Sequence, residues 1–290
     1  MKKFTILIPI FNDWDSLIKL LSKINDNVKN LKEVKFDCVI VNDCSTIKNP
    51  KIKIPPQINS IKIIHMNKNK GHARCNAFGI KYLSKNINFD YLILMDGDGE
   101  DRPEEIKSLI DKVLSEPNKS VVAKRIKRSE GFIFQILYRL HKCITLLATG
   151  KLINFGNYSC LIKSDIKKLS TKASLWSSYS GTFKKNIEDY NEVSSIRGMR
   201  YFGPSQMSLF RLLIHSFSII AVFKHRVFSS SIIFLASLHY LAFLIKFNFL
   251  FFYILIVLFN ISVFIVSFRE NERELESSQL DVDDIESLTH

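Results

Sequence analysis

Residues 91–105, YLILMDGDGEDRPEE, join a hydrophobic run to a loop that is rich in carboxylates. The run at 91–95 has the length and composition of a buried strand. Asp96 and Asp98 follow it directly and are separated by one glycine. Carboxylates held this close raise each other's pKa unless a cation or a functional demand keeps them together. The stretch therefore predicts a metal site; the alternatives are a plain acidic turn and a calcium loop, whose twelve-residue pattern Pro103 interrupts.

The sequence around this stretch alternates between strand-like and helix-like patterns. Further runs of β-branched and aromatic residues occur at 4–8, 36–41, 61–65 and 120–123. Stretches with helical spacing lie between them, as at Trp14, Leu17 and Leu21. This alternation predicts an α/β fold with a mostly parallel sheet. In such sheets ligands bind beyond the carboxyl ends of the strands.

Polar and basic residues follow the first three predicted strands. They are Pro9, Asn12 and Asp13 after the first, Asp43 and Ser45 after the second, and Lys68, Lys70, Gly71 and Arg74 after the third. Asp43 and Ser45 can hydrogen-bond a base or a ribose, and the basic residues precede a helix whose amino terminus suits a phosphate. The alternatives are ordinary turn residues and a solvated basic turn.

Two segments near the carboxyl terminus are long and apolar. Residues 227–245 and 249–268 contain no Asp, Glu, Lys or Arg, and each is close to the ~20 residues that span a bilayer. A connector of three residues forces a tight helical hairpin, and basic residues flank its outer ends, which the positive-inside rule places in the cytoplasm. Two buried helices of a soluble protein are the alternative. The start of the chain lacks the pattern of a cleavable signal, so we expect the first domain in the cytoplasm.

The segment 207–223 is apolar, with Arg211 and His215 on one helical face, which predicts a helix at the membrane interface or, equally well, a linker helix. The expected division is a catalytic domain at 1–206, an interfacial helix at 207–226, a hairpin at 227–268 and an acidic cytoplasmic tail at 269–290. The tail carries two basic and eight acidic side chains, so the rest of the chain is even more basic than the net charge of +13. With no nucleic-acid motif present, we expect a membrane and phosphate-bearing ligands as partners, and no nucleic acid.

The motifs P-x-x-N-D, N-D-x-S, N-x-G-x-A-R and M-D-x-D-x-x-D-x-P-E, in this order, resemble the inverting family-two glycosyltransferases of GT-A fold. The polyprenyl-phosphate sugar transferases are the most similar type. The resemblance covers residues 4 to about 210, and the paired carboxyl-terminal spans match the bactoprenol type. It implies a UDP- or GDP-linked sugar donor, a polyprenyl phosphate acceptor, Mg²⁺ or Mn²⁺, and a place in the inner (cytoplasmic) membrane. The number of subunits stays open, with a homo-oligomer as one option.

The resemblance also implies roles for matching residues. The nucleotide sugar would be held by Pro9, Asn12, Asp13, Asp43, Ser45, Lys70, Gly71, Arg74 and Asp96, and the metal by Asp96 and Asp98. A later segment, RGMRYFGPSQMS at 197–208, follows a predicted strand at 193–196 and is similar to the family's arginine segment. Arg197 and Arg200 would act with Asp98 in catalysis, because guanidinium groups match phosphate oxygens. Contact with the membrane surface is the alternative for both arginines. Asn157 and Ser205 would lie in the acceptor region.

Two positions depart from the family pattern. Asn42 stands where the family usually has an aspartate, and Asn157 and Ser159 stand where it has an acidic and a basic residue. The loss of an acid at 157 implies a different acceptor or weak catalysis. A polyprenyl phosphate is already ionised and needs no base, unlike a sugar hydroxyl, so we favour transfer to a lipid phosphate. The alternatives are extension of a glycan, with Asp101 or Glu100 as base, and a non-catalytic partner of an active relative.

Overall fold

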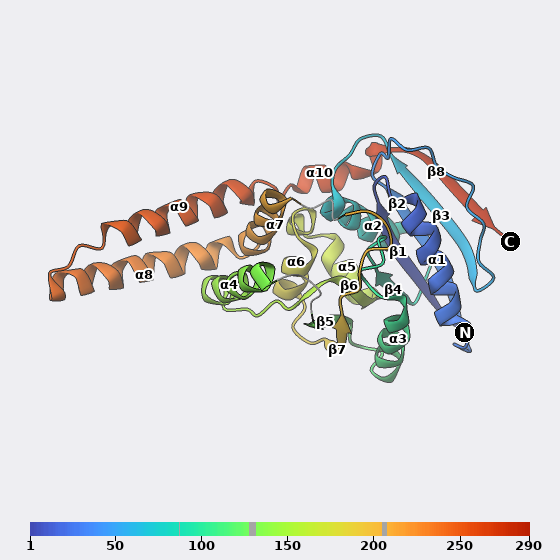
Figure 1. Ribbon diagram of the computed structural model, residues 1–290, viewed down its shortest axis with the longest axis horizontal. Helices are drawn as coiled ribbons and strands as arrows, with labels where there is room; N and C mark the ends of the chain where they lie inside the picture. The colour runs from blue at the N-terminus through green and yellow to red at the C-terminus, as the bar shows by residue number, and fades with distance from the viewer. Residues whose placement is uncertain (87, 128–131, 205–207) are drawn as a thin grey trace.

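The computed structural model describes residues 1–86, 88–127, 132–204 and 208–290. Its centre is an eight-stranded sheet with the order β7-β5-β6-β4-β1-β2-β3-β8 (Figure 1). The strands are β1 (Lys2–Ile10), β2 (Val34–Asn42), β3 (Ile58–Met66), β4 (Tyr91–Leu94), β5 (Val121–Lys127), β6 (Phe155–Ile162), β7 (Asn191–Ile196) and β8 (Val282–Thr289). The pairs β1–β2, β1–β4, β2–β3 and β5–β7 are parallel, which confirms the predicted α/β class.

Helices cover both faces of the sheet. They include α1 (Trp14–Val28), α2 (His72–Asn86), α3 (Ile106–Ser115), α5 (Lys163–Ser170) and α6 (Tyr179–Asn186). Successive residues of β1 point to opposite faces, so Ile6 and Ile8 join the core under α1 and α3, while Leu7 joins the core under α2, α5 and α6. A side chain at Gly79 would come within 2.5 Å of Leu7, so this glycine lets α2 lie close to the sheet.

Two antiparallel strands were not predicted. β6 lies between β4 and β5, antiparallel to both, and brings Asn157 to the middle of the sheet. β8 belongs to residues 269–290, which sequence analysis treated as a separate acidic tail. In the structure these residues form α10 (Glu272–Ser277) and then pair antiparallel with β3. The last part of the acidic tail therefore forms an edge strand of the central sheet.

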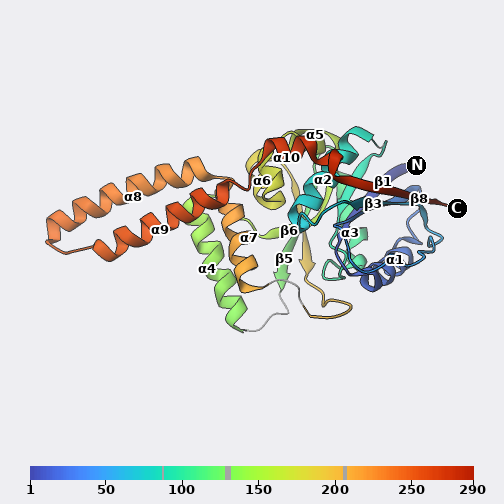
Figure 2. The ribbon, with the colours of Figure 1, turned by 90° about the horizontal axis from the view of Figure 1, so that it is seen from above.

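A helical hairpin projects away from the sheet (Figure 1). It consists of α8 (Lys224–Ile245) and α9 (Leu250–Ser267), and both helices are long and apolar enough to cross a membrane by length and composition. At its base lie α7 (Leu209–Ala221) and α4 (Phe132–Thr149) (Figure 2). The expected interfacial helix corresponds to α7, and its position at a membrane surface stays a prediction.

Candidate active site

The loop after β4 lies against the end of β1. The backbone N–H of Met95 donates to the carbonyl of Leu7 at 3.1 Å, and the chain then turns through the D-G-D sequence. A side chain at Gly97 would come within 2.9 Å of Ile10 and 3.1 Å of the Pro9 carbonyl. Only glycine therefore lets the loop pass this closely, and the predicted residue Pro9 lies beside it.

The arginine segment folds onto the same loop from far along the chain. The N–H of Gly198 donates to the carbonyl of Glu100 at 2.8 Å, and that of Tyr201 donates to the carbonyl of Asp98 at 2.9 Å. Gly99 has φ +88°, and a side chain there would meet the Tyr201 ring at 2.6 Å. The backbone itself thus holds the segment after β7 against the carboxylates.

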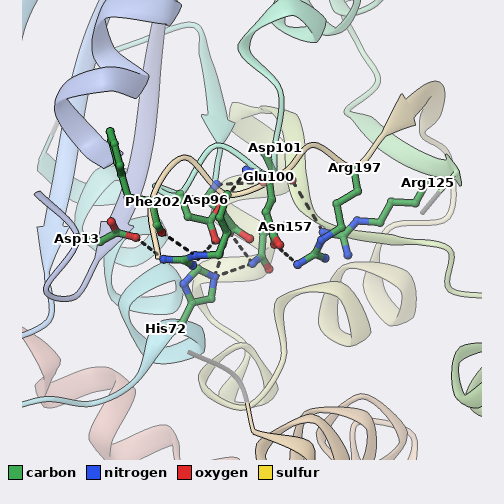
Figure 3. A network of polar contacts seen from close by, with 11 residues as sticks. Asp13, His72, Asp96, Glu100, Asp101, Arg125, Asn157, Arg197 and Phe202 are labelled. Carbon is green, nitrogen blue, oxygen red and sulfur yellow. Dashed lines mark hydrogen bonds and ion pairs between the residues drawn. The ribbon is translucent and has the colours of Figure 1, made fainter. Parts of the chain in front are cut away.

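Arg200 bridges two strand ends. Its Nη1 donates to Asp98 at 2.8 Å and its Nη2 donates to Asp13 at 2.6 Å, across 102 and 187 positions of sequence. Arg197 pairs with Glu100. Both predicted arginines therefore lie among the acidic residues. Figure 3 shows Arg197 beside Glu100.

His72, Asn157 and Asp96 meet on the other side of the loop (Figure 3). Asp96 Oδ1 lies 3.1 Å from His72 Nε2 and 3.1 Å from Asn157 Nδ2, and the latter two atoms are 2.8 Å apart. Asn157, the departure from the family's acid, is therefore in direct contact with the first predicted metal ligand. An acid at this position would add negative charge beside Asp96, whereas the amide donates a hydrogen bond to it.

Asp101 is buried beneath the loop. Its carboxylate accepts the N–H of Asp96 at 3.0 Å and lies 3.8 Å from the guanidinium of Arg125. Each of the four carboxylates between 96 and 101 thus has a cationic or imidazole neighbour, and Asp101 serves to shape the loop.

The acidic side chains titrate far from their usual values. Burial raises the pKa of Asp98 to about 6, and the charges of Asp96 and Glu100 add to the effect. Burial and the charge of Asp96 also raise the pKa of Asp101 to about 7. Burial acts in the same direction on Asp96, but the charge and hydrogen bond of His72 outweigh it and hold its pKa below the usual range. Such a cluster gains from further positive charge.

The expected nucleotide residues form two linked loops after β1 and β2. Asn12, with φ 53°, accepts the N–H of Thr46 on Oδ1 at 2.8 Å and donates its own N–H to Ser45 Oγ at 2.8 Å. Asp43 is buried and accepts the N–H groups of Lys70 at 2.7 Å and Gly71 at 2.8 Å. The structure therefore brings the predicted residues of three strand ends together.

The basic side chains after β3 have partners other than the carboxylates of the D-G-D loop. Lys68 and Lys70 form ion pairs with Asp281 of the tail at 3.1 and 2.9 Å. The guanidinium of Arg74 lies over the Trp176 ring, 5.7 Å from its centre. Ser205, the other predicted acceptor residue, lies outside the described residues.

The carboxylates fit a hard divalent cation only together with a substrate. Oxygen ligands suit Mg²⁺ or Mn²⁺, and Asp96 and Asp98 supply two of them. Within the described ranges, no three His, Cys, Asp or Glu side chains are grouped to hold a metal ion. The remaining ligands would therefore come from a diphosphate and from water, which is the usual arrangement for Mg²⁺.

Sequence reasoning missed three residues of this site. His72 follows the predicted Gly71 directly, but a histidine at the start of a helix gives no signal by itself. Arg125 comes from the end of β5, and Asp281 comes from the tail. Pairing between strands brings both of them to the site, so only the sheet topology reveals them.

Comparisons with known proteins agree with this geometry. The undecaprenyl-phosphate 4-deoxy-4-formamido-L-arabinose transferase of Photorhabdus laumondii is 26% identical over 226 residues, which are 73% of this chain and 65% of the relative. The protein of the same name from Serratia proteamaculans is 25% identical over 223 residues, with the same coverage. This chain thus matches less than two thirds of the length of these curated relatives.

Solved structures show the same fold. Mannosyl-3-phosphoglycerate synthase from Rubrobacter xylanophilus superposes with a TM-score of 0.55 at 10% identity, over 79% of this chain and 74% of the other. Glucosyl-3-phosphoglycerate synthase from Mycobacterium tuberculosis, in complex with Mn²⁺, UDP-glucose and phosphoglyceric acid, gives 0.50 at 13% identity, over 78% and 80%. The model of the glycosyl transferase family 2 matches residues 5–198, which are more than half of the chain. The resemblance seen in the motifs is therefore confirmed, and the chain belongs to the glycosyl transferase family 2.

Proposed function

We propose that this protein transfers a sugar from a UDP- or GDP-linked donor to a polyprenyl phosphate at the cytoplasmic face of a membrane, with Mg²⁺ or Mn²⁺ as cofactor. The observation that carries the proposal is the bridge of Arg200 between Asp13 and Asp98. This bridge connects an arginine, a residue type suited to phosphate, to Asp13 of the first predicted nucleotide loop and to Asp98, one of the two predicted metal ligands. The printed names of the relatives support the lipid acceptor, and the solved complex with Mn²⁺ and UDP-glucose supports the donor and the metal.

The residues around the loop supply positioning and charge. A bound divalent cation would stabilise the negative charge of the departing diphosphate. Arg200 and Arg197 place two guanidinium groups against the loop after β4, where their planar forks can bind phosphate oxygens. Asp43, Asn12 and Ser45 would orient the nucleoside, because each is fixed by hydrogen bonds between neighbouring loops.

Among the described residues, the two carboxylates predicted as bases of a glycan-extending enzyme are both engaged, which favours a phosphate acceptor. Asp101 is buried and accepts a backbone hydrogen bond, and Glu100 pairs with Arg197, so both candidate bases of a glycan-extending enzyme are engaged. Asn157 cannot act as a base. A lipid phosphate is ionised at neutral pH and needs alignment more than proton removal.

The hairpin supports a membrane-bound enzyme. Its helices leave large apolar side chains exposed, with Phe243 at 77% and Phe251 at 66%. Leu147 of α4 and Phe210 of α7 are also exposed apolar side chains, at 76% and 72%. Because α9 leads back to α10 and β8, both open ends of the hairpin lie on the side of the catalytic sheet. With Lys224–Arg226 at the first open end, the positive-inside rule favours the cytoplasmic face of the inner membrane.

A transfer assay tests the proposal. Membranes containing the protein would be incubated with radiolabelled UDP- and GDP-sugars, Mn²⁺ and undecaprenyl phosphate. We expect a lipid-extractable labelled product, lost in Asp98→Asn and kept in the surface control Asp26→Asn. A labelled glycan without lipid product would show the glycan-extending alternative, and no product with any donor would favour a non-catalytic partner.

A further inference from the structure

We propose that the acidic carboxyl-terminal strand is part of the donor site, with Asp281 and Glu286 as positioning residues for the two loops that hold the nucleotide. The inference rests on the proposed function, because it concerns the nucleotide pocket of that transferase. It gives the tail a role in the reaction, in addition to covering an edge of the sheet.

β8 begins where the loops carry the site. It runs antiparallel to β3, so that Val282 lies opposite Met66 at the carboxyl end of β3, and Thr289 lies opposite Ser60 near its start. The N–H of Asn67 donates to the carbonyl of Asp281 at 2.8 Å, which extends the pairing into the loop after β3. The tail therefore reaches the edge of the sheet at which ligands bind.

Asp281 holds the loop after β3. Its carboxylate lies 3.1 Å from the ammonium of Lys68 and 2.9 Å from that of Lys70, and the side chains of Lys70 and Asp281 are only 12% and 14% exposed. The backbone of the same turn supplies the N–H groups of Lys70 and Gly71 to the Asp43 carboxylate. Asp281 thus holds the turn at Lys68–Gly71 through its ion pairs, and the backbone of this turn holds the Asp43 carboxylate.

Glu286 contacts the loop after β2 in two ways. Its carboxylate accepts from the side-chain amide of Asn49, a residue of that loop, at 3.0 and 3.2 Å. It also lies beside His65, whose ring is hydrogen-bonded to Asn42. The Ser45 N–H donates to Asn42 Oδ1 at 3.1 Å, so the amide nitrogen of Asn42 must face His65. That nitrogen can only donate, so the His65 Nδ1, 2.9 Å away, is the acceptor. In the neutral ring the proton is then on Nε2, which lies 3.3 Å from Glu286.

The chain continues to the first strand end. Ser45 Oγ accepts the N–H of Asn12 at 2.8 Å, so hydrogen bonds lead from His65 through Asn42 and Ser45 to the loop after β1. Glu286 lies against the His65 end of this path. The departure from the family pattern at Asn42 also has a reason here. An aspartate has no proton to donate to Nδ1, so the asparagine is matched to the histidine and to the tail.

Other tail contacts serve as internal controls. Glu276 pairs with Lys81, a buried lysine of α2, and Glu274 accepts the Trp176 indole N–H at 2.9 Å. These contacts anchor α10 to the body of the domain and reach neither nucleotide loop through the bonds described above. Loss of Glu276 should therefore lower thermal stability, because it leaves a buried charge unpaired, without changing nucleotide affinity.

The test uses the full chain in detergent and measures binding of UDP and of GDP, each with Mn²⁺, by calorimetry, and melting by thermal denaturation. For the nucleotide that binds, we expect Glu286→Ala and Asp281→Ala to raise the dissociation constant about five- to tenfold, which is within the effect of losing one ordinary hydrogen bond. Glu286→Gln should stay within about twofold, because the amide oxygen of glutamine can still accept from Asn49. Glu276→Ala should melt earlier with unchanged affinity, and Asp283→Ala, an exposed carboxylate of the same strand, should change neither.

Two results would overturn the inference in distinguishable ways. If the wild-type protein bound neither nucleotide, the proposed function would fail and the inference with it. If the wild type bound one and both alanine variants bound it equally well, or no worse than Asp283→Ala, only the role of the tail would fail. If Glu286→Ala does not fold, the affinity of Asp281→Ala alone tests the inference, because Asp281 holds the loop after β3 and not the loop after β2.

Discussion

Replacing Arg200 by lysine separates a phosphate-binding role from a membrane-surface role. The guanidinium of Arg200 uses two different nitrogens to reach Asp98 at 2.8 Å and Asp13 at 2.6 Å. A lysine ammonium keeps the positive charge but cannot span both carboxylates with a planar fork. Arg200→Lys therefore changes the geometry of the site while leaving its charge intact.

The expected loss follows from these two contacts. A hydrogen bond to a charged group contributes about 1.5–3 kcal/mol, and lysine keeps one of the two. Because the Arg200 side chain is only 16% exposed, screening by water reduces the loss little. We therefore expect kcat/KM for the nucleotide sugar to fall at least tenfold, which corresponds to about 1.4 kcal/mol.

The assay combines turnover with membrane association. Lipid-linked product would be measured at several donor concentrations, and binding to liposomes that contain anionic lipid would be measured by sedimentation. Arg200→Lys should sediment like the wild type, and the exposed control Arg273→Lys should keep both properties. Near-normal turnover in both Arg200→Lys and Arg197→Lys would refute the reasoning and assign these arginines to the membrane surface.

Four further predictions follow from the same geometry. Asp98→Asn should remove metal-dependent turnover while the protein still folds; full turnover of this variant in the presence of a chelator would refute the metal site. The pKa of Asp98, raised to about 6, makes the folded state hold a proton that the unfolded chain loses near pH 4. Thermal stability without metal should therefore fall as pH rises from about 4 to about 7, less so in Asp98→Asn, and an equal slope in both would contradict this. Gly99→Ala should lower the free energy of unfolding by about 1–3 kcal/mol in a denaturant titration, because φ +88° and the Tyr201 ring leave no room for a methyl group. A reporter after His290 should read as cytoplasmic and one at Phe247 as external. The opposite pair of signals would refute this orientation, and a cytoplasmic signal at both positions would exclude a membrane-spanning hairpin.

The sequence predicted the parallel part of the sheet well. Strands such as 4–8 and 36–41 are apolar runs interrupted only by Thr5 and Asp37, because both faces of the sheet are covered by helices, and the structure has them as β1 and β2. The D-G-D loop and the arginines were found because each set of functional residues lies within a few consecutive positions. Their direct contact across the fold could not be read from spacing, since Arg200 and Asp98 are 102 positions apart.

The two missed strands have physical reasons. β6 carries Asn157 and Ser159 among its apolar residues, so its pattern is weaker than that of its neighbours. β8 has the sequence VDDIESLT, whose acidic residues are poor strand formers. It forms because it pairs with β3, because Glu286 lies against His65, and because Asp281, just before the strand, pairs with Lys70. Tertiary contacts therefore determine that this segment is a strand, and local strand propensity does not predict it.

Either a bound metal ion or basic side chains of the protein can stabilise the crowded carboxylates of the D-G-D loop, and the structure shows how the two are compatible. Without any ligand, Asp96 faces His72, Asp98 faces Arg200, and Glu100 faces Arg197. The protein's own cations thus already stabilise the loop, so acidic density alone is weak evidence for a metal. The stronger evidence is that two of these three partners, Arg197 and Arg200, are arginines, which bind phosphate as readily as carboxylate. A metal and a diphosphate entering together would exchange partners with them, the cation going to the carboxylates and the phosphates to the arginines, so the site can bind the pair without leaving a buried charge uncompensated.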